Sequence, residues 1–488
     1  MKNLPSSDML LSRIREHEKL SGGQLVLLTI LLSLPSILSQ FSTVAMEYID
    51  ASMLGHVGAL EAASVGLVAT TTWLIMGLCS ALSTGFNVQV AHLIGARNLS
   101  AVRMVLCQAF ATAILFSALL ALVGVSLSSS LPVWLGADES IQHSATAYFM
   151  VFSLFIPMLQ MTNLMSGMLR CSGNVRVPSF LNVLMCLMDV VFNFFLIFPS
   201  RTAAFFGREL QLPGLGLGAE GAALGTGLAM SLTAILLLYF VLRKSPMPSL
   251  KGSTLKDFIP SRDCLKKAFI IGAPIGLERC VMNGAQIMLT TIVAPLGPLS
   301  IAANSFGITI EGLCYMPGYG ISDAATTLVG QSYGAGRRRL ARRLAMINVS
   351  LGMAVMSVMG ALMYLFAPLM LSTMTPEADI VTMGTTILRI EAFAEPMFAA
   401  AIVSYGAFVG AGKTIVSSLM NLGSMWIVRI SLALILAPLY GLRGVWIAMC
   451  IELCFRGSAF LLRLFCTRWE REVLAPYIKE QKRKEKTA

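Results

Sequence analysis

The chain repeats a set of proline, glycine and asparagine residues at a constant separation of 239 positions. Pro35 is matched by Pro274, and Gly95-Ala96 is matched by Gly334-Ala335. The same separation relates Gly58 to Gly297, Pro157 to Pro396, Gly173 to Gly412 and Asn182 to Asn421. A repeat of this length indicates two duplicated lobes rather than a solenoid of short units.

The composition is typical of a membrane protein, because 56% of the 488 residues are hydrophobic and only 12% are charged. A soluble domain carries about twice this share of charge. Runs of about 20 apolar residues are long enough to cross a bilayer of about 30 Å. Twelve such runs are present, at 25–49, 62–86, 105–127, 147–169, 177–198, 221–242, 267–294, 301–327, 344–366, 388–410, 415–436 and 444–465.

We therefore expect an all-α polytopic membrane protein with twelve transmembrane helices in two pseudo-symmetric six-helix lobes. An even number of spans gives both lobes the same orientation, and duplicated bundles of this kind are typical of secondary transporters. The expected segments are a cytoplasmic N-terminal tail (1–24), an N-lobe (25–242), a cytoplasmic linker (243–266), a C-lobe (267–465) and a basic cytoplasmic C-terminal tail (466–488). The first 20 residues are too polar for a cleavable signal and predict a short amphipathic or mobile tail.

The net charge of +11 comes from Lys and Arg residues concentrated in alternate loops, such as Arg337-Arg338-Arg339. By the positive-inside rule, this pattern places both termini in the cytoplasm of a protein that crosses the cell (inner) membrane many times. The charge is thus explained by contact with the lipid bilayer and does not indicate a nucleic-acid partner. We expect a monomer.

Enzymatic and metal chemistry find little support in the sequence. The ten cysteines are scattered without a CxxC pair, and the four histidines offer no metal-ligand spacing, so we expect no cofactor and no metal site. The segment 406–414 is similar to a phosphate-binding G-x-x-x-x-G-K-T loop, but Ala407 stands where the first Gly is required. It also follows an apolar helix rather than a strand, so we do not expect ATP hydrolysis.

Several motifs resemble those of the multidrug and toxin extrusion (MATE) family, within the wider multidrug/oligosaccharidyl-lipid/polysaccharide exporter superfamily. They are 48–55 (YIDASMLG), 90–96 (VAHLIGA) with its copy 328–336 (LVGQSYGAG), 169–174 (LRCSGN), 218–223 (GAEGAA) and 441–446 (GLRGVW). Their order in the six-plus-six layout covers about residues 25–465. The resemblance implies a two-lobed exporter that moves cationic or amphipathic compounds outward against proton or sodium entry.

Ionisable residues inside spans are costly unless they face a cavity or a partner, so the acids of the spans are the best site candidates. In the N-lobe these are Glu47 and Asp50, three residues apart at the end of the first span, and Asp189 in the fifth. Pro35 lies about four turns before Asp50 and predicts a bend in that helix.

The resemblance adds Asn193, one turn after Asp189, and the hydroxyl of Thr226 to this set of coupling-ion candidates. The order of Asp189 and Asn193 is reversed relative to the family pattern. Two carboxylates close together in a cavity of low dielectric repel each other, so the pair can hold and exchange a proton. The same oxygens suit sodium, and the choice between H+ and Na+ stays open.

The C-lobe offers several acids as candidates for substrate contact. Glu278 follows Pro274 by four residues, and it either serves the cavity or pairs with Arg279. Glu391 and Glu395 are one turn apart and so are expected to share a helical face, with Arg389 near Glu391 as a structural counter-charge. The remaining acids of the C-lobe spans are Glu311, Asp323 and Glu452, the last spaced to pair with Arg456.

We predict a secondary active multidrug exporter that works by alternating access. Its substrates are small organic cations or amphipathic compounds, recognised by acids and aromatic faces such as that of Trp73. Two alternatives stay open, a lipid-linked precursor flippase and a dedicated exporter of one endogenous metabolite. A flippase would be expected to carry a cationic cavity, whereas the candidate sites are acidic. A receptor or channel would be excluded by uphill transport.

Overall fold

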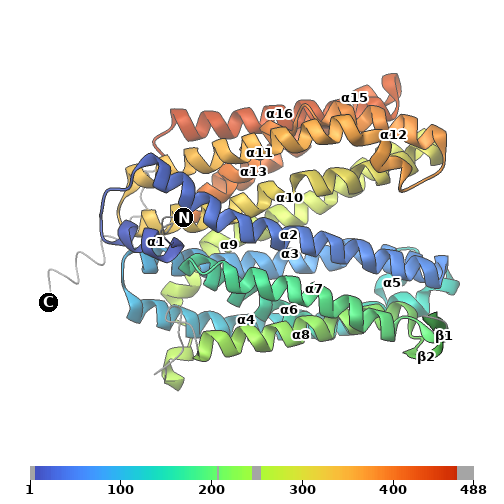
Figure 1. Ribbon diagram of the computed structural model, residues 1–488, viewed down its shortest axis with the longest axis horizontal. Helices are drawn as coiled ribbons and strands as arrows, with labels where there is room; N and C mark the ends of the chain where they lie inside the picture. Colours follow the sequence, from blue (N-terminus) through green and yellow to red (C-terminus); the bar gives the residue numbers. More distant parts are fainter. Residues whose placement is uncertain (1–5, 206–207, 244–253, 470–488) are drawn as a thin grey trace. The chain divides into compact units, whose positions relative to one another are not determined.

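The computed structural model describes residues 6–205, 208–243 and 254–469. Figure 1 shows that the chain consists mainly of long helices. The first half contains α1 (Ser7–Arg15), α2 (Gly22–Val57), α3 (Ala59–Gly95), α4 (Leu99–Leu127), α5 (Leu131–Trp134), α6 (Glu139–Ser172), α7 (Arg176–Leu196) and α8 (Gly218–Arg243).

The second half repeats this order, with more breaks inside its helices. It contains η1 (Leu255–Phe258), α9 (Arg262–Val293), η2 (Ala294–Leu296), α10 (Pro298–Gly334), α11 (Arg338–Ser372), α12 (Ala378–Glu391), α13 (Glu395–Gly410), α14 (Thr414–Gly423), the π-helical η3 (Ser424–Ile430), α15 (Ser431–Tyr440) and α16 (Leu442–Cys466).

Each of the twelve predicted spans coincides with one helix or with one broken helix. Nine helices of the described chain are long and apolar enough to cross a membrane, and α12 with α13 forms a tenth span bent by 57°. The other two predicted spans are α9 and α10, which have 32 and 37 residues and are not among these ten. The all-α class and the twelve-helix layout are confirmed.

The duplication is visible in the helix boundaries themselves. Helices α3 and α10 both have 37 residues, and they begin and end 239 positions apart. Helix α6 begins at Glu139 and α12 at Ala378, which is the same separation. The matched prolines and glycines therefore mark the same points of the same helices.

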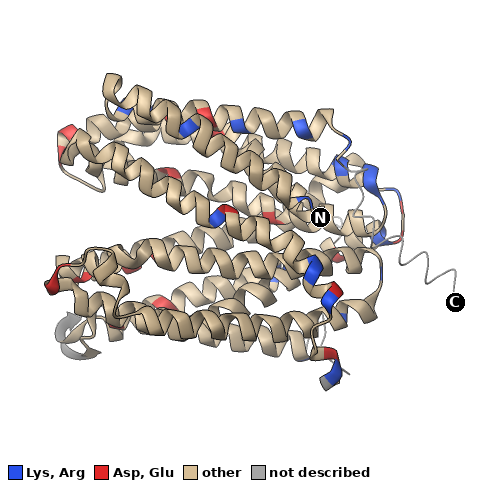
Figure 2. Ribbon diagram, turned by 180° about the vertical axis from the view of Figure 1, so that it is seen from behind, with Lys and Arg blue, Asp and Glu red and all other residues tan. Residues whose placement is uncertain are grey.

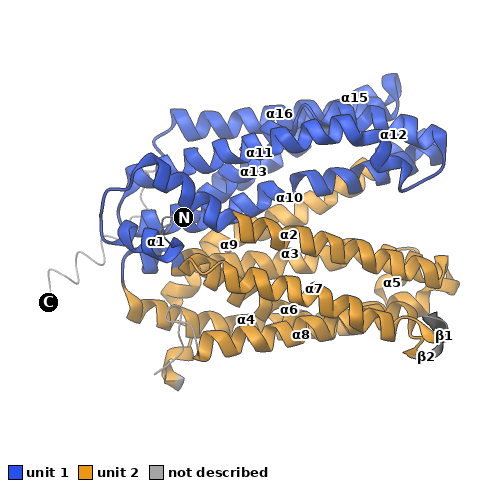
Figure 3. Ribbon diagram, viewed as in Figure 1, with its two compact units in different colours: residues 1–33, 91–97, 291–488 blue, residues 34–90, 98–290 orange. Residues whose placement is uncertain are grey.

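The helices group into two compact units, shown in Figure 3. Unit 1 contains residues 1–33, 91–97 and 291–488, and unit 2 contains residues 34–90 and 98–290. The predicted lobes follow the duplication whereas the units follow packing, so the boundaries differ within α2, α3 and α9. Helix α2 changes unit between Ser33 and Leu34, next to Pro35. The lobe boundaries stay a prediction, and parts of the predicted linker and tails (1–5, 244–253 and 470–488) lie outside the described residues.

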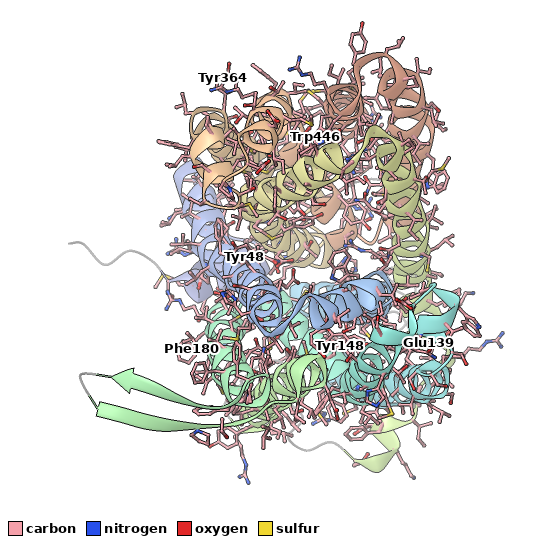
Figure 4. The ribbon with its side chains drawn as sticks, turned by 90° about the vertical axis from the view of Figure 1, so that its right-hand side faces the viewer. Tyr48, Glu139, Tyr148, Phe180, Tyr364 and Trp446 are labelled. Atoms are coloured by element: carbon pink, nitrogen blue, oxygen red, sulfur yellow. The ribbon has the colours of Figure 1, made fainter. Side chains whose placement is uncertain are left out.

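Each unit has its own apolar core. In unit 2, Val68 and Cys79 of α3 pack with Phe149 of α6. In unit 1, Trp446 of α16 is the centre of a buried cluster, and its indole Nε1 donates to Asn304 Oδ1 of α10 at 3.0 Å. Trp446 is labelled among the helices of this unit in Figure 4.

Two matched glycines allow a reciprocal helix contact within unit 1. A Cβ atom on Gly95 of α3 would overlap the carbonyl oxygen of Gln331, and one on Gly334 of α10 would overlap that of His92. His92 and Gln331 are themselves 239 positions apart. The two copies of this motif therefore pack against each other, and each requires a glycine in the other.

The N-terminal helix α1 is amphipathic, one of the two forms predicted for this tail. Leu10, Leu11 and Ile14 are fully buried in unit 1. Arg337 closes the C-terminal end of α1 by donating to the carbonyl oxygens of Arg13 and Ile14 at 3.4 and 3.2 Å. Helix α1 is thus packed against the connection that follows α10.

A β-hairpin between α7 and α8 was not predicted from the sequence. Strand β1 (Pro199–Phe205) pairs with β2 (Arg208–Leu215) in antiparallel register. Close by, Glu61 of α3 accepts hydrogen bonds from Ser144 Oγ at 3.1 Å and from the backbone N–H of Ala219 at 2.8 Å. Glu61 therefore joins α3, α6 and the first turn of α8, where a carboxylate suits the unpaired N–H groups.

Candidate functional site

One asparagine in unit 2 joins two carboxylates from different helices. The side-chain Nδ2 of Asn193 on α7 donates to Asp50 Oδ1 of α2 at 2.7 Å and to Asp189 Oδ2 at 3.1 Å. The two hydrogens of one amide nitrogen thus serve two acids. Because an amide does not titrate, Asn193 holds the pair together whatever its protonation state.

The pair is deeply buried on its α7 side. Asp189 and Asn193 are fully buried, whereas Asp50 is half-buried. Asp189 Oδ1 and Asn193 Oδ1 have no hydrogen-bond partner among the described residues. A buried oxygen without a partner is costly, so these atoms are suited to receive a proton or a cation.

The packing of α7 against its neighbours sets this geometry. A Cβ atom on Gly225 of α8 would overlap Asn193 Oδ1, so only glycine lets α8 approach α7 at this level. About three turns before Asn193 on α7, Asn182 Nδ2 donates to Ser39 O and Thr43 Oγ1 of α2, each at 3.0 Å. Helix α7 is therefore fixed to α2 on the segment that follows Pro35.

A cavity of about 220 Å³ in unit 2 opens beside the pair. Its polar lining includes Asp50, Glu47 and Thr226, and its aromatic lining consists of Trp73, Tyr148, Phe152 and Phe155. Asp189 and Asn193 are absent from this lining and lie behind Asp50. An acid next to aromatic faces is an arrangement that suits an organic cation.

The structure thus places the five N-lobe candidates in one region of unit 2. Sequence reasoning missed Tyr148 and Gly225, because an aromatic residue or a glycine inside an apolar span reads as packing. Trp73 was singled out and lines the cavity. Tyr148 lies among the helices of unit 2 in Figure 4.

A second group of acids is buried in unit 1. Glu391 and Glu395 are fully buried, and Glu311 of α10 is 7% exposed. None of the four carboxylate oxygens of Glu391 and Glu395 has a hydrogen-bond partner in the described part of the chain. The positive charges of Arg429 and Arg456 lie within electrostatic range of Glu311.

Two expectations for this group need correction. Glu391 ends α12 and Glu395 begins α13, so the helix breaks between them and they do not share a continuous helical face. Arg389 donates to the carbonyl of Tyr364 at 3.3 Å and lies over its ring at 5.1 Å. Arg389, the counter-charge expected for Glu391, is thus directed toward Tyr364 of α11, because it contacts both the carbonyl and the ring of that residue.

The remaining acids are paired or lie in the other unit. Glu452 and Arg456 form the predicted ion pair at 3.0 Å, and Ser424 in the π-helical η3 donates to Glu452. Glu278 is 7% exposed and lies on the part of α9 that belongs to unit 2.

Neither a metal site nor a nucleotide site is found in the part of the chain that the structure describes. Over residues 6–205, 208–243 and 254–469, no group of three or more His, Cys, Asp and Glu side chains could hold a metal ion. The segment 406–414 joins helix α13 to helix α14. It therefore lacks the strand that precedes a phosphate-binding loop.

Comparisons with known proteins cover most of the chain. The MatE family profile matches residues 35–195 and 274–435. A "Probable multidrug resistance protein NorM" of Thermotoga maritima is 25% identical over 445 residues, which cover 91% of this chain and 93% of the relative. A protein of the same name from Bacillus anthracis is 25% identical over 441 residues, with 89% and 94% covered.

Solved structures share the fold. A structure described as MATE in complex with MaL6 has a TM-score of 0.83 at 21% identity, covering 95% of this chain and 99% of that chain. A multidrug resistance MATE family transporter in an outward-facing conformation also has a TM-score of 0.83 at 21% identity, with 97% and 100% covered.

Proposed function

Because the chain belongs to the MATE family of membrane efflux transporters, which are not enzymes, we propose that it is a multidrug antiporter. It carries cationic or amphipathic organic compounds out of the cell while H+ or Na+ enters. The observation that carries this proposal is the Asn193-bridged pair of Asp50 and Asp189 beside a cavity with aromatic walls.

The acid pair of unit 2 is assigned to the coupling ion. Asp50 and Asp189 repel each other when both are charged, and a proton or a sodium ion relieves that repulsion. The unpartnered oxygens of Asp189 and Asn193 add acceptors for the ion. Glu47 and Thr226 add polar groups on the cavity side. No other cofactor is required.

Exchange follows from competition for the same negative charge. An organic cation in the cavity lies next to Asp50, and its charge replaces that of the coupling ion. Because one carboxylate pair is neutralised by either partner, binding of the ion favours release of the substrate. This drives transport only if the ion binds one conformation of the protein more tightly than the other.

Helix α2 is assigned to the conformational step. Its part up to Ser33 belongs to unit 1, and the part that carries Asp50 belongs to unit 2. Pro35 removes one backbone hydrogen bond next to this division, which eases bending. Neutralisation of Asp50 is thereby linked to the angle of α2, in alternating access between the two sides of the membrane.

The acids of the second half are assigned to substrate contact. Glu311, Glu391 and Glu395 concentrate negative charge in unit 1, and Glu278 adds a further buried carboxylate in unit 2. This acidity favours cationic cargo over the anionic cargo of a lipid-linked precursor flippase. A dedicated exporter of a single cationic metabolite would use the same groups. The protein acts as a monomer in the cell membrane, with both termini in the cytoplasm.

Transport by purified protein in liposomes tests the proposal. The liposomes contain a fluorescent organic cation, and a proton gradient or a sodium gradient is imposed separately. Asp50→Asn is compared with Asp263→Asn, which makes the same change at an exposed position of α9 in the same unit. We expect one gradient to drive transport by the wild type and by Asp263→Asn, but not by Asp50→Asn.

The alternatives give different results in the same assay. Gradient-driven transport that survives in Asp50→Asn would refute the assignment of the coupling site. A wild-type protein that moves the cation under neither gradient, but flips a lipid-linked precursor, would be a flippase. Transport of one metabolite and of no other cation would identify a dedicated exporter.

A further inference from the structure

A groove on the surface of unit 2 lies between the first turns of α7 and the last turns of α8. It has a volume of about 390 Å³ and is lined by Arg176, Phe180 and Leu181 of α7 and by Leu236, Tyr239 and Phe240 of α8. We call it the α7–α8 groove. It shares no residue with the cavity beside Asp50.

The walls of the groove are apolar and open to the surroundings of the protein. The side chain of Phe180 is 68% exposed and that of Tyr239 is 54% exposed. Phe180 lies at the outer edge of unit 2 in Figure 4. Since both helices cross the membrane, lipid rather than water covers these aromatic rings.

The outer faces of the two helices continue the apolar surface away from the groove. On α7, Leu187 and Val191 are 61% and 52% exposed. On α8, Leu232 and Ile235 are 38% and 60% exposed. An acyl chain that starts in the groove therefore has an apolar path along the helices toward the membrane centre.

One end of the groove is positively charged. Arg176 is the first residue of α7, is exposed, and forms no ion pair or hydrogen bond with the residues that the structure describes. Tyr239 places a hydroxyl group in the same lining, and no Asp or Glu is part of it. A phosphate would thus meet a cation without an opposing carboxylate.

The α7–α8 groove lies at a level of the membrane where an anionic headgroup is expected. Within each unit, Lys and Arg gather toward one end of the helices (Figure 2), and α7 begins and α8 ends there. By the positive-inside rule this end faces the cytoplasm, where the leaflet is rich in anionic lipids. Tyrosine and arginine are the side chains that anchor at the headgroup level.

We propose that the α7–α8 groove binds one anionic phospholipid of the cytoplasmic leaflet, such as phosphatidylglycerol. Arg176 contacts the phosphate, the Tyr239 hydroxyl contacts the headgroup, and an acyl chain lies between Phe180 and Leu236. A zwitterionic lipid fills the apolar walls equally well but brings no net charge to Arg176. The binding is therefore selective for charge rather than for chain.

Native mass spectrometry of the full chain measures this selectivity. The purified protein is mixed with equal amounts of phosphatidylglycerol and phosphatidylcholine that carry the same acyl chains. A single Lys or Arg near an anionic lipid contributes about 1 kcal/mol, so we expect about fivefold tighter retention of phosphatidylglycerol. Arg176→Gln removes this preference, and Arg176→Lys keeps most of it.

The matched control is Arg262→Gln. Arg262 is also an exposed arginine at the first position of a membrane helix in unit 2, but it does not line the groove. It should retain the wild-type preference. Phe180→Ala should weaken retention of both lipids alike, because it removes part of the apolar wall.

Two results would overturn the proposal. In one, the wild type retains both lipids equally. In the other, Arg262→Gln lowers the preference as much as Arg176→Gln does, which would show a general effect of surface charge. The cation-transport assay is independent of this measurement, so failure of one proposal leaves the other standing.

Discussion

The two halves of the chain share their helices but place their acids at different positions. In unit 2 the two acids bridged by Asn193 come from α2 and α7, and the positions that match Asp50 and Asp189 in the second half are Leu289 and Val428. In unit 1 the acids Glu311, Glu391 and Glu395 come from the copies of α3 and α6. None of these acids has a carboxylate at the matching position of the other half, although the separation of 239 positions is kept.

The positions of the unit 1 acids have a definite counterpart. Glu311, Glu391 and Glu395 match Thr72, Phe152 and Ile156, and all three of these line the cavity of unit 2. One copy of the fold thus keeps these wall positions uncharged and obtains its acids from elsewhere. The other copy has acids at the matching positions. The duplicated helices thus keep matching positions, whereas the side chains at those positions are uncharged in one half and acidic in the other.

We assign the acids of unit 2 to the coupling ion and those of unit 1 to the substrate, and this division of roles predicts that Asp189→Asn has the largest effect on transport. It keeps the shape of the side chain but removes a charge from the bridged pair, so gradient-driven transport should fall to the level of protein-free liposomes. The measurement is efflux of a fluorescent cation under an imposed gradient. Efflux at half the wild-type rate or more would mean that Asp50 alone carries the coupling.

Glu452→Gln tests whether the buried ion pair of Glu452 and Arg456 stabilises unit 1. It leaves Arg456, which is 8% exposed, without its partner, and such a loss costs about 3 kcal/mol or more. Denaturant unfolding in detergent should show this decrease in the free energy of unfolding. The double variant Glu452→Gln/Arg456→Gln should lose less than Glu452→Gln alone. A loss in the double variant equal to the sum of the losses in Glu452→Gln and Arg456→Gln would indicate that the pair is not coupled.

Gly225→Ala tests how tightly the bridge in unit 2 is built. The added methyl group would displace Asn193 Oδ1, and we expect about a tenfold loss of gradient-driven transport, equivalent to about 1.4 kcal/mol. Gly66→Ala is the matched control, because nothing lies within 4 Å of a Cβ at that helical position. A similar loss in both variants would point to helix packing in general.

The double variant Glu391→Gln/Glu395→Gln should have the smallest effect of this series. It removes two buried charges that we assign to the substrate, so the half-saturating substrate concentration should rise about fivefold, or about 1 kcal/mol. The dependence on the driving gradient should stay unchanged. Loss of gradient dependence instead would place the coupling ion in unit 1 and break the division of roles.

The helices were predictable because their signals are local and strong. The apolar runs, the matched prolines and the glycines defined all twelve spans, and helix α3 differs from its predicted span 62–86 only by extending beyond both ends. The hairpin at 199–215 was missed because short strands between two spans have no such signal. The break between Glu391 and Glu395 was missed because the residues between them, Ala392, Phe393 and Ala394, are ordinary in helices.

The candidate site was predictable in membership but not in geometry. The rarity of charge in the spans singled out Asp50 and Asp189, and the family resemblance added Asn193. That one amide bridges both acids depends on the approach of α7 to α2, which no local pattern reports. The direction of Arg389 toward Tyr364 likewise depends on the packing of α12 against α11, which the sequence does not report.

The reciprocal contact of Gly95 and Gly334 has a consequence for how such a chain can change over generations. Each glycine leaves space for a backbone carbonyl of the other copy. A side chain at either position would therefore overlap the opposite helix. An unchanged glycine in one copy does not remove the clash that a substitution of the other glycine creates. The acids do not pack against their matching positions in the other half, so a change at one leaves the other unaffected. The two glycines do pack against the opposite copy, so both must stay glycine.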